Sequence, residues 1–310
     1  MLSRVADSLY WMSRYFERAD HCSRVLEANY ILLLNPSKPS REARWNRITE
    51  ALGLKPEFSS GDSQATIMRL ISQPGNRSSI VSSITGAREN ASQVREQISS
   101  EMWESLNQLY HKVTAASSAE SDLDPLRLLT SFREGAYQFY GVSDSTMNHG
   151  EGWYFIQLGR FMERACGLSL LLDAHFSESN GADDLDWVGL LSSCAAVEAY
   201  RKVNTSNVSP ECVADFLILN PEFPHTVRYA ADQMHFALEK IAEITASRKG
   251  ARSERLIGKL RASLTYIGIE EILGRNLHTY LNGVLEQCHS LHAAMHHIFI
   301  DYPIESALEA

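Results

Sequence analysis

The feature that most restricts the fold of this chain is the spacing of its apolar residues. In nearly every long segment they recur at intervals of three and four, and no segment alternates convincingly with period two. Glycine and proline, which punctuate sandwiches and barrels, occupy only 17 and 9 of the 310 positions. The sequence therefore predicts an all-α helical bundle, with a bend at Ser99–Ser100. The expected helices cover 4–34, 41–52, 62–72, 78–99, 100–117, 125–140, 148–175, 186–202, 210–218, 224–247, 253–274 and 276–300.

Composition excludes several classes of function. The net charge of −9 opposes a general nucleic-acid or anionic-membrane surface, so neither is an expected partner. The five cysteines are scattered without a CxxC spacing, which indicates reduced thiols and a cytoplasmic protein. No secretory signal is visible, and the longest apolar runs are too short to span a bilayer. No GxSxG elbow or glycine-rich phosphate loop occurs, so no hydrolase site and no cofactor are predicted.

A short charged motif occurs twice. "RYFERA" (14–19) aligns with "RFMERA" (160–165), 146 residues later. Trp45 and Ile48 match Trp187 and Leu190, and "QPGNRSSI" (73–80) matches "NPEFPHTV" (220–227), at similar offsets. Three matches in the same order indicate an internal duplication, with helical halves at 1–145 and 146–310. We expect the halves to share one core around a pseudo-twofold axis rather than to fold as separate domains.

On a helix, positions i, i+3 and i+4 are neighbours, so each motif presents two arginines and a glutamate on one arc. The two sets are Arg14, Glu17 and Arg18, and Arg160, Glu163 and Arg164. Tyr10 and His21 share the first arc, and Trp153 borders the second. A solvated face with intrahelical ion pairs is the simplest interpretation of one copy, but two copies make it less attractive.

Two interpretations of the paired motif remain open. The arcs could face each other as a buried ion-pair network that fixes the register of two helices. Alternatively they could line a cleft in which guanidinium groups hold carboxylate or phosphate. The anion-binding candidates are then Arg14, Arg18, Arg160 and Arg164, with Tyr10 and His21 beside them. Glu17 and Glu163 would orient the arginines or serve as catalytic acid or base.

The last helix carries a weaker signal. Glu286, His289, His292 and His296 follow one another at spacings of three and four, as in metal sites of helical bundles. One helix rarely supplies a complete site, and no second carboxylate-histidine helix is evident. No metal site is therefore predicted.

Several blocks resemble the alpha-E family of bacterial all-helical proteins, which is named for a Glu-Arg motif. They are "MLSRVADSLYWMSRYFERAD" (1–20), "SSIVSSITGARENASQVREQISSEMWESLN" (78–107), "MNHGEGWYFIQLGRFMERA" (147–165) and "DFLILNPEFPHTV" (215–227). The resemblance covers essentially the whole chain, and His149 departs from it where the family favours arginine. It implies a partnership with a circularly permuted ATP-grasp protein, often with a transglutaminase-like protease. A role in ATP-dependent peptide or amide-bond formation follows from that association.

Three functional hypotheses result. In the first, the chain is a helical partner of an ATP-grasp ligase and itself binds an anionic group through the paired motifs. In the second, it is an enzyme that acts on the ligase product, with Glu17 or Glu163 as the acid or base. In the third, it is a structural scaffold. The sequence leaves the oligomeric state open, a homo-oligomer included.

Overall fold

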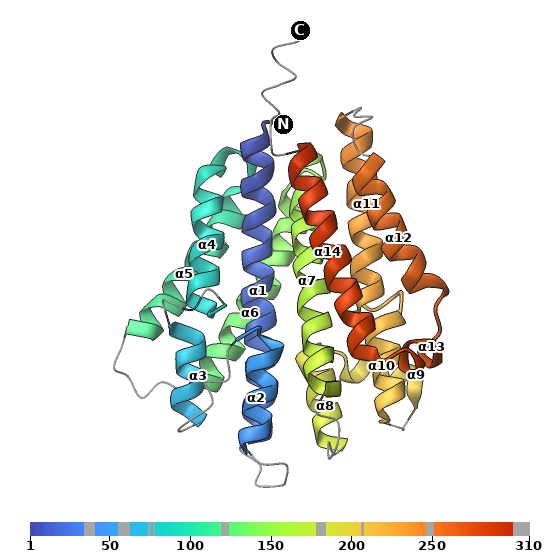
Figure 1. Ribbon diagram of the computed structural model, residues 1–310. Helices are drawn as coiled ribbons and strands as arrows, with labels where there is room; N and C mark the ends of the chain where they lie inside the picture. Colours follow the sequence, from blue (N-terminus) through green and yellow to red (C-terminus); the bar gives the residue numbers. More distant parts are fainter. Residues whose placement is uncertain are drawn as a thin grey trace.

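The computed structural model describes residues 1–33, 41–54, 63–73, 76, 78–118, 124–177, 184–205, 208–245 and 251–299. The loop predicted at 35–40 lies outside them, as does the part of the loop predicted at 178–187 that precedes residue 184. Every regular element in these ranges is helical, which confirms the all-α prediction (Figure 1). The helices are α1 (Ser3–Leu33), α2 (Arg41–Ala51), α3 (Ser63–Ser72), α4 (Ile80–Gln93), η2 (Arg95–Gln97), α5 (Ser100–Ser118), α6 (Pro125–Thr146), α7 (Glu151–Ser177), α8 (Asp184–Ser193), α9 (Val197–Asn204), α10 (Pro210–Leu219), α11 (Val227–Thr245), α12 (Ala251–Tyr266), α13 (Ile269–Gly274) and α14 (Leu277–Phe299).

Several helices begin at side chains that cap their free N–H groups. The Ser79 hydroxyl accepts from the third residue beyond it at the start of α4, and Ser209 does the same for α10. The Asp124 carboxylate caps α6, and proline occupies the first helical position of both α6 and α10. These are the residue types that hydrogen-bonding and the fixed φ of proline favour at a helix start.

The expected bend at Ser99–Ser100 is wrong, because the chain reverses there. α4 ends before Val94, and α5 packs back against α4 after the η2 turn. The buried side chains of Val94 and Ile98 anchor the turn in the core. Across the two helices, Arg88 Nε donates to Asn107 Oδ1 at 2.6 Å.

Two helices predicted as continuous are interrupted. The segment 186–202 divides into α8 and α9 because Ala195 takes a left-handed conformation with φ 52°. Alanine rarely adopts this conformation, so no local signal marked the break. The segment 253–274 likewise divides into α12 and α13, with Gly268 preceding α13 in an extended conformation.

Helices α1 and α7 form the centre of the bundle and run side by side (Figure 1). They are parallel, since the amino group of Met1 pairs with Glu151 while His21 lies against Gly167. α4 and α6 pack on α1, and α11 and α14 pack on α7. At the end of the bundle away from the N-terminus, α2 packs mainly against α7, and α8 packs against α1 (Figure 1). A helix from the first part of the chain thus contacts the central helix of the second part, and the reverse.

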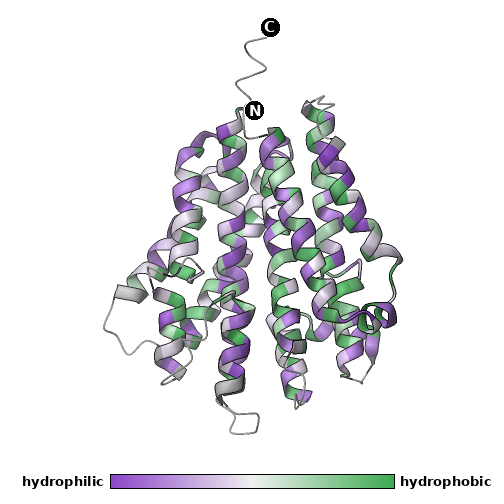
Figure 2. Ribbon diagram, in the orientation of Figure 1, coloured by the Kyte–Doolittle hydropathy of each residue, from purple (hydrophilic) through white to green (hydrophobic). Residues whose placement is uncertain are grey.

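One apolar core joins both halves. Buried residues of α1, α4 and α6 are continuous with those of α7, α11 and α14. Figure 2 nevertheless shows hydrophilic residues along α1 in the middle of the bundle. These polar residues at the centre are the starting point for the candidate site.

Candidate functional site

The close approach of α1 and α7 depends on a glycine. A Cβ at Gly159 would collide with the backbone carbonyl of Tyr10 and the hydroxyl of Ser13. Residues on α1 therefore face residues about 147 positions later on α7. This parallel register brings the two charged motifs together.

The glutamate of each motif binds the arginines of the other. Glu163 accepts hydrogen bonds from Arg14 Nε at 2.7 Å and from Arg18 Nε at 2.6 Å. Glu17 accepts from Arg164 Nε at 2.6 Å and Nη2 at 2.9 Å, and Arg160 Nε lies 3.6 Å from the same carboxylate. We call this set of six residues the ion-pair cluster. Its reciprocity is what two copies related by a twofold axis would produce, although the duplication itself stays a prediction.

Both glutamates of the cluster are ionised near neutral pH. Burial alone would raise the pKa of Glu17, but the charges of Arg164 and Arg160 and hydrogen bonds from Arg164 and Tyr140 outweigh it and lower the pKa to about 2. Burial of Glu163 is likewise outweighed by Arg14 and Arg18, which lower its pKa. General acid-base catalysis works best with a pKa near the operating pH. The catalytic role of both residues stays a prediction, and their geometry suits them to hold arginines.

Tyr10 and His21 lie on either side of the cluster along α1. The Tyr10 hydroxyl is hydrogen-bonded to His292 Nδ1 at 2.9 Å and lies 3.5 Å from Arg14 Nη1. Burial lowers the pKa of His21 to about 4, so its ring is neutral at pH 7. Neither side chain lines the two cavities described below. A direct role for them in anion binding stays a prediction.

The four arginines differ in exposure. The side chains of Arg14 and Arg164 are 11% and 2% exposed, whereas those of Arg18 and Arg160 are 26% and 23% exposed. Four arginines facing two glutamates leave an excess of positive charge. Arg160 has the longest ion pair of the cluster and a partly exposed side chain, so its positive charge is the least compensated and lies near solvent.

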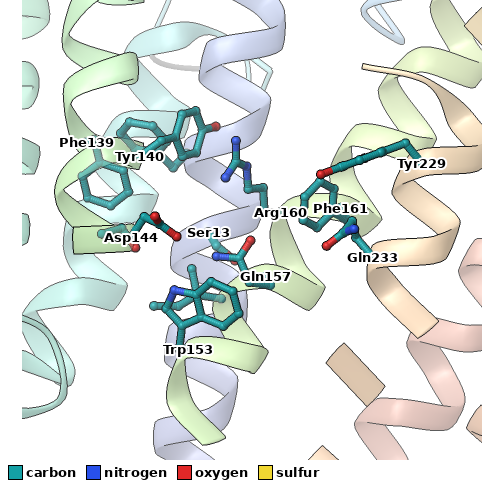
Figure 3. A pocket seen from close by; sticks show the side chains of 13 residues that line it. Ser13, Phe139, Tyr140, Asp144, Trp153, Gln157, Arg160, Phe161, Tyr229 and Gln233 are labelled. Carbon is teal, nitrogen blue, oxygen red and sulfur yellow. The ribbon is translucent and has the colours of Figure 1, made fainter. Parts of the chain in front are cut away.

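Arg160 opens into a cavity of about 210 Å³ between α6, α7 and α11, with α1 behind it (Figure 3). We call it the Arg160 pocket. Its lining consists of aromatic, amide, hydroxyl and charged side chains: Ser13, Phe16, Phe139, Tyr140, Ser143, Asp144, Trp153, Ile156, Gln157, Arg160, Phe161, Tyr229 and Gln233. Sequence patterns located Arg160 and its neighbour Trp153 but missed Tyr140, Asp144 and Tyr229. Those three come from α6 and α11, which only tertiary packing brings to α7.

The electrostatics of the Arg160 pocket favour an anion. The guanidinium lies over the ring of Tyr140 at 3.8 Å, which leaves its N–H edge for other partners. Burial and the neighbouring Arg164 lower the pKa of Arg160, and a negative group beside it would stabilise the charged guanidinium and offset that shift. Arg160 Nε, Trp153 Nε1 and Ser143 Oγ are buried without a hydrogen-bond partner among the described residues. Such groups cost free energy unless a ligand or water satisfies them.

A second, more open groove of about 670 Å³ lies between α1 and α4. Arg18 reaches it from the cluster, beside the rings of Trp11 and Tyr15. A Cβ at Gly86 would meet the Tyr15 ring at 3.1 Å, so the groove narrows there. This groove is a weaker ligand site because Glu163 holds Arg18 by a short bond.

The histidines of the last helix serve other contacts. His292 stacks on Tyr10 with ring centroids 5.6 Å apart, and His296 Nε2 lies 3.5 Å from Asp7. Within the part of the chain that the structure describes, no three His, Cys, Asp or Glu side chains group as metal ligands. Across the same part, no helix combines the length and apolar character needed to cross a membrane.

Known proteins and a known family are similar to this chain in sequence. An uncharacterised protein of Mycobacterium tuberculosis and one of Mycobacterium bovis are each 24% identical to this chain over 293 residues, covering 87% of it. The alignment covers only 33% of each relative, so the chain spans about a third of their length. No solved structure matches the chain. The alpha-E family model, described as a predicted alpha-helical domain with a conserved ER motif, matches residues 1–300, and Glu17–Arg18 and Glu163–Arg164 are such pairs at the centre of the fold. The chain belongs to the alpha-E family.

Proposed function

We propose that this protein is the helical partner of an ATP-grasp ligase in ATP-dependent peptide or amide-bond formation, and that it binds a carboxylate- or phosphate-bearing group at Arg160. The observation that carries the binding role is the Arg160 pocket, where a partly exposed arginine from a positively charged cluster lies near the buried N–H of Trp153, which has no hydrogen-bond partner among the described residues. The family supplies the expectation of an ATP-grasp partner. The longer relatives, of which this chain matches a third, agree with a domain that acts beside another domain.

In this proposal the cluster has two tasks. The buried pairs of Glu17 with Arg164 and of Glu163 with Arg14 fix the register of α1 and α7. Arg160 stays available because Glu17 is already bound by Arg164 through two short hydrogen bonds. The structural and anion-binding interpretations of the motif thus apply to different members of one cluster.

Reconstitution tests the proposal. The purified chain is combined with an ATP-grasp protein of the circularly permuted kind that the family implies, ATP and a pool of amino acids, and ADP release and new amide products are measured by mass spectrometry. We expect product only when the chain is present, and at least tenfold less with Arg160→Lys, which keeps the charge but loses the planar fork. Arg261→Lys, on the exposed face of α12, is the matched control and should retain full product.

Equal product with and without the chain would disprove the partnership. Equal product with wild-type and Arg160→Lys protein would disprove the binding role of Arg160. The alternatives are separated by Glu163→Gln: a variant that loses turnover at unchanged ligase binding supports catalysis, whereas one that only melts earlier supports a structural role.

A further inference from the structure

We infer that the Arg160 pocket binds a zwitterionic α-amino acid, with the ligand carboxylate at Arg160 and its ammonium group at Asp144. This inference rests on the proposed function and names the substrate class of the same site. It follows from the two ends of the pocket, which carry opposite charges, and from the pocket's size.

The Arg160 end is built for the carboxylate. The indole N–H of Trp153 can only donate and is buried without a hydrogen-bond partner among the described residues, so it requires an acceptor. Arg160 Nε makes no hydrogen bond either, and its ion pair with Glu17 is long, at 3.6 Å. A carboxylate supplies two oxygens with several lone pairs and matches the guanidinium edge. Figure 3 shows the hydroxyl end of Tyr229 turned toward the same space from the opposite wall.

The other end of the pocket is negative. Asp144 lies four residues beyond Tyr140 on α6, so the two levels of the pocket are separated by about 6 Å along the helix. Its side chain is 72% exposed, and His149 Nε2 lies 3.8 Å from its Oδ1. A carboxylate at the rim, beside the ring of Trp153, suits an ammonium group (Figure 3).

The charge of Asp144 also decides between the two anions that Arg160 could accept. A phosphate dianion at Arg160 would place two negative charges in the pocket that the carboxylate of Asp144 also lines, and like charges repel. A zwitterion places its negative end at Arg160 and its positive end at Asp144, so both pocket charges are compensated.

The volume of the pocket sets the size of the ligand. Sites for drug-sized ligands typically measure about 300–1,000 Å³, whereas this pocket measures about 210 Å³. A nucleotide is therefore too large, and ATP would bind on the ligase. The aromatic wall formed by Phe16, Phe139 and Phe161 leaves room for an apolar part of the ligand.

Binding to the purified chain alone tests this inference without the ligase. Each standard amino acid is screened by thermal shift, and the strongest is titrated by calorimetry beside its N-acetyl derivative, its amide, acetate and inorganic phosphate. We expect the N-acetyl derivative and the amide to bind at least tenfold more weakly than the parent. Asp144→Asn should weaken the parent about tenfold and leave the N-acetyl derivative unchanged, whereas Arg160→Gln should abolish binding of both.

Glu134→Gln, at an exposed position on α6 away from the pocket, is the matched control and should bind like wild type. Because Asp144 is exposed, its substitution should leave the circular dichroism and melting temperature intact. Binding of acetate or phosphate that depends on Arg160, without preference for an amino acid, would overturn this inference and leave the proposed function standing. If the purified chain binds an amino acid at Arg160 but adding the chain to the ligase reaction changes no product, the inference stands and the proposed function is overturned. No binding by any amino acid would refute the inference.

Discussion

Replacing Glu17 with glutamine should destabilise the protein by about 3 kcal/mol. The carboxylate is 1% exposed and accepts two hydrogen bonds from Arg164 and one from Tyr140. Its pKa falls from 4.5 to about 2 on folding, and at about 1.4 kcal/mol per pH unit this corresponds to about 3 kcal/mol. Removing one partner of a buried ion pair costs about 3–5 kcal/mol in other proteins, which agrees. Glutamine keeps the shape but leaves Arg164 buried without a counter-charge.

Urea denaturation and calorimetry at pH 7 measure the loss, which should lower the melting temperature by about 6 °C or more. The control Glu243→Gln removes an exposed partner of Lys240 and should leave stability unchanged. The pH dependence gives a second arm. Because folding lowers the pKa of Glu17, its contribution is complete above about pH 4.5 and disappears as the pH falls toward 2. The difference between wild type and Glu17→Gln should therefore shrink over that range.

The reasoning is refuted if Glu17→Gln costs less than about 1 kcal/mol at pH 7, below the usual range for a broken buried pair. It is also refuted if the difference from wild type is as large near pH 2 as at pH 7. A double variant, Glu17→Gln with Arg164→Met, should lose less stability than the two single variants combined, because the buried guanidinium is removed with its partner.

Three further predictions follow from packing and burial. Gly159→Ala should lower the free energy of unfolding by about 3 kcal/mol in urea denaturation, because its Cβ meets the α1 backbone. The control Gly141→Ala, in open space on α6, should stabilise the protein by about 0.5 kcal/mol. An unchanged stability of Gly159→Ala would contradict the close packing of α1 and α7. Ala195→Gly should stabilise by about 0.5 kcal/mol by relieving the left-handed φ, and a loss of stability would show that the alanine is unstrained. Burial raises the pKa of the Cys22 and Cys194 thiols to about 12, so iodoacetamide at pH 8 should leave both unmodified by mass spectrometry until the protein is unfolded.

The helical content was predictable because apolar spacing and N-capping residues such as Ser79 and Asp124 act locally. The break at Ala195 was not, since its left-handed conformation falls on an exposed residue that does not favour it, between the buried Cys194 and Ala196. The paired motifs predicted that Arg14, Glu17 and their counterparts matter together. Sequence could not choose between an anion site and a mutual network, because that choice depends on the parallel register of α1 and α7.

Only part of the Arg160 pocket could be predicted from the sequence. Spacing along one helix placed Arg160 and Trp153 on one side of α7, but the opposite wall comes from helices far away in the chain. Asp144 reads in the sequence as one of many surface carboxylates. Its interest arises only because it lines the same cavity as Arg160.

The pairing of α1 with α7 also bears on when the native structure can form. A ribosome delivers Glu17 long before Arg160 and Arg164, so a nascent α1 carries a carboxylate whose main counter-ions do not yet exist. Such a group remains hydrated, because burying an uncompensated charge is prohibitively unfavourable. We therefore expect the centre of the bundle to close only after α7 has been synthesised, because its ion pairs join distant parts of the chain. A nascent chain interrupted between the two motifs would be left as a substrate for chaperones and proteases, not as a half-sized protein.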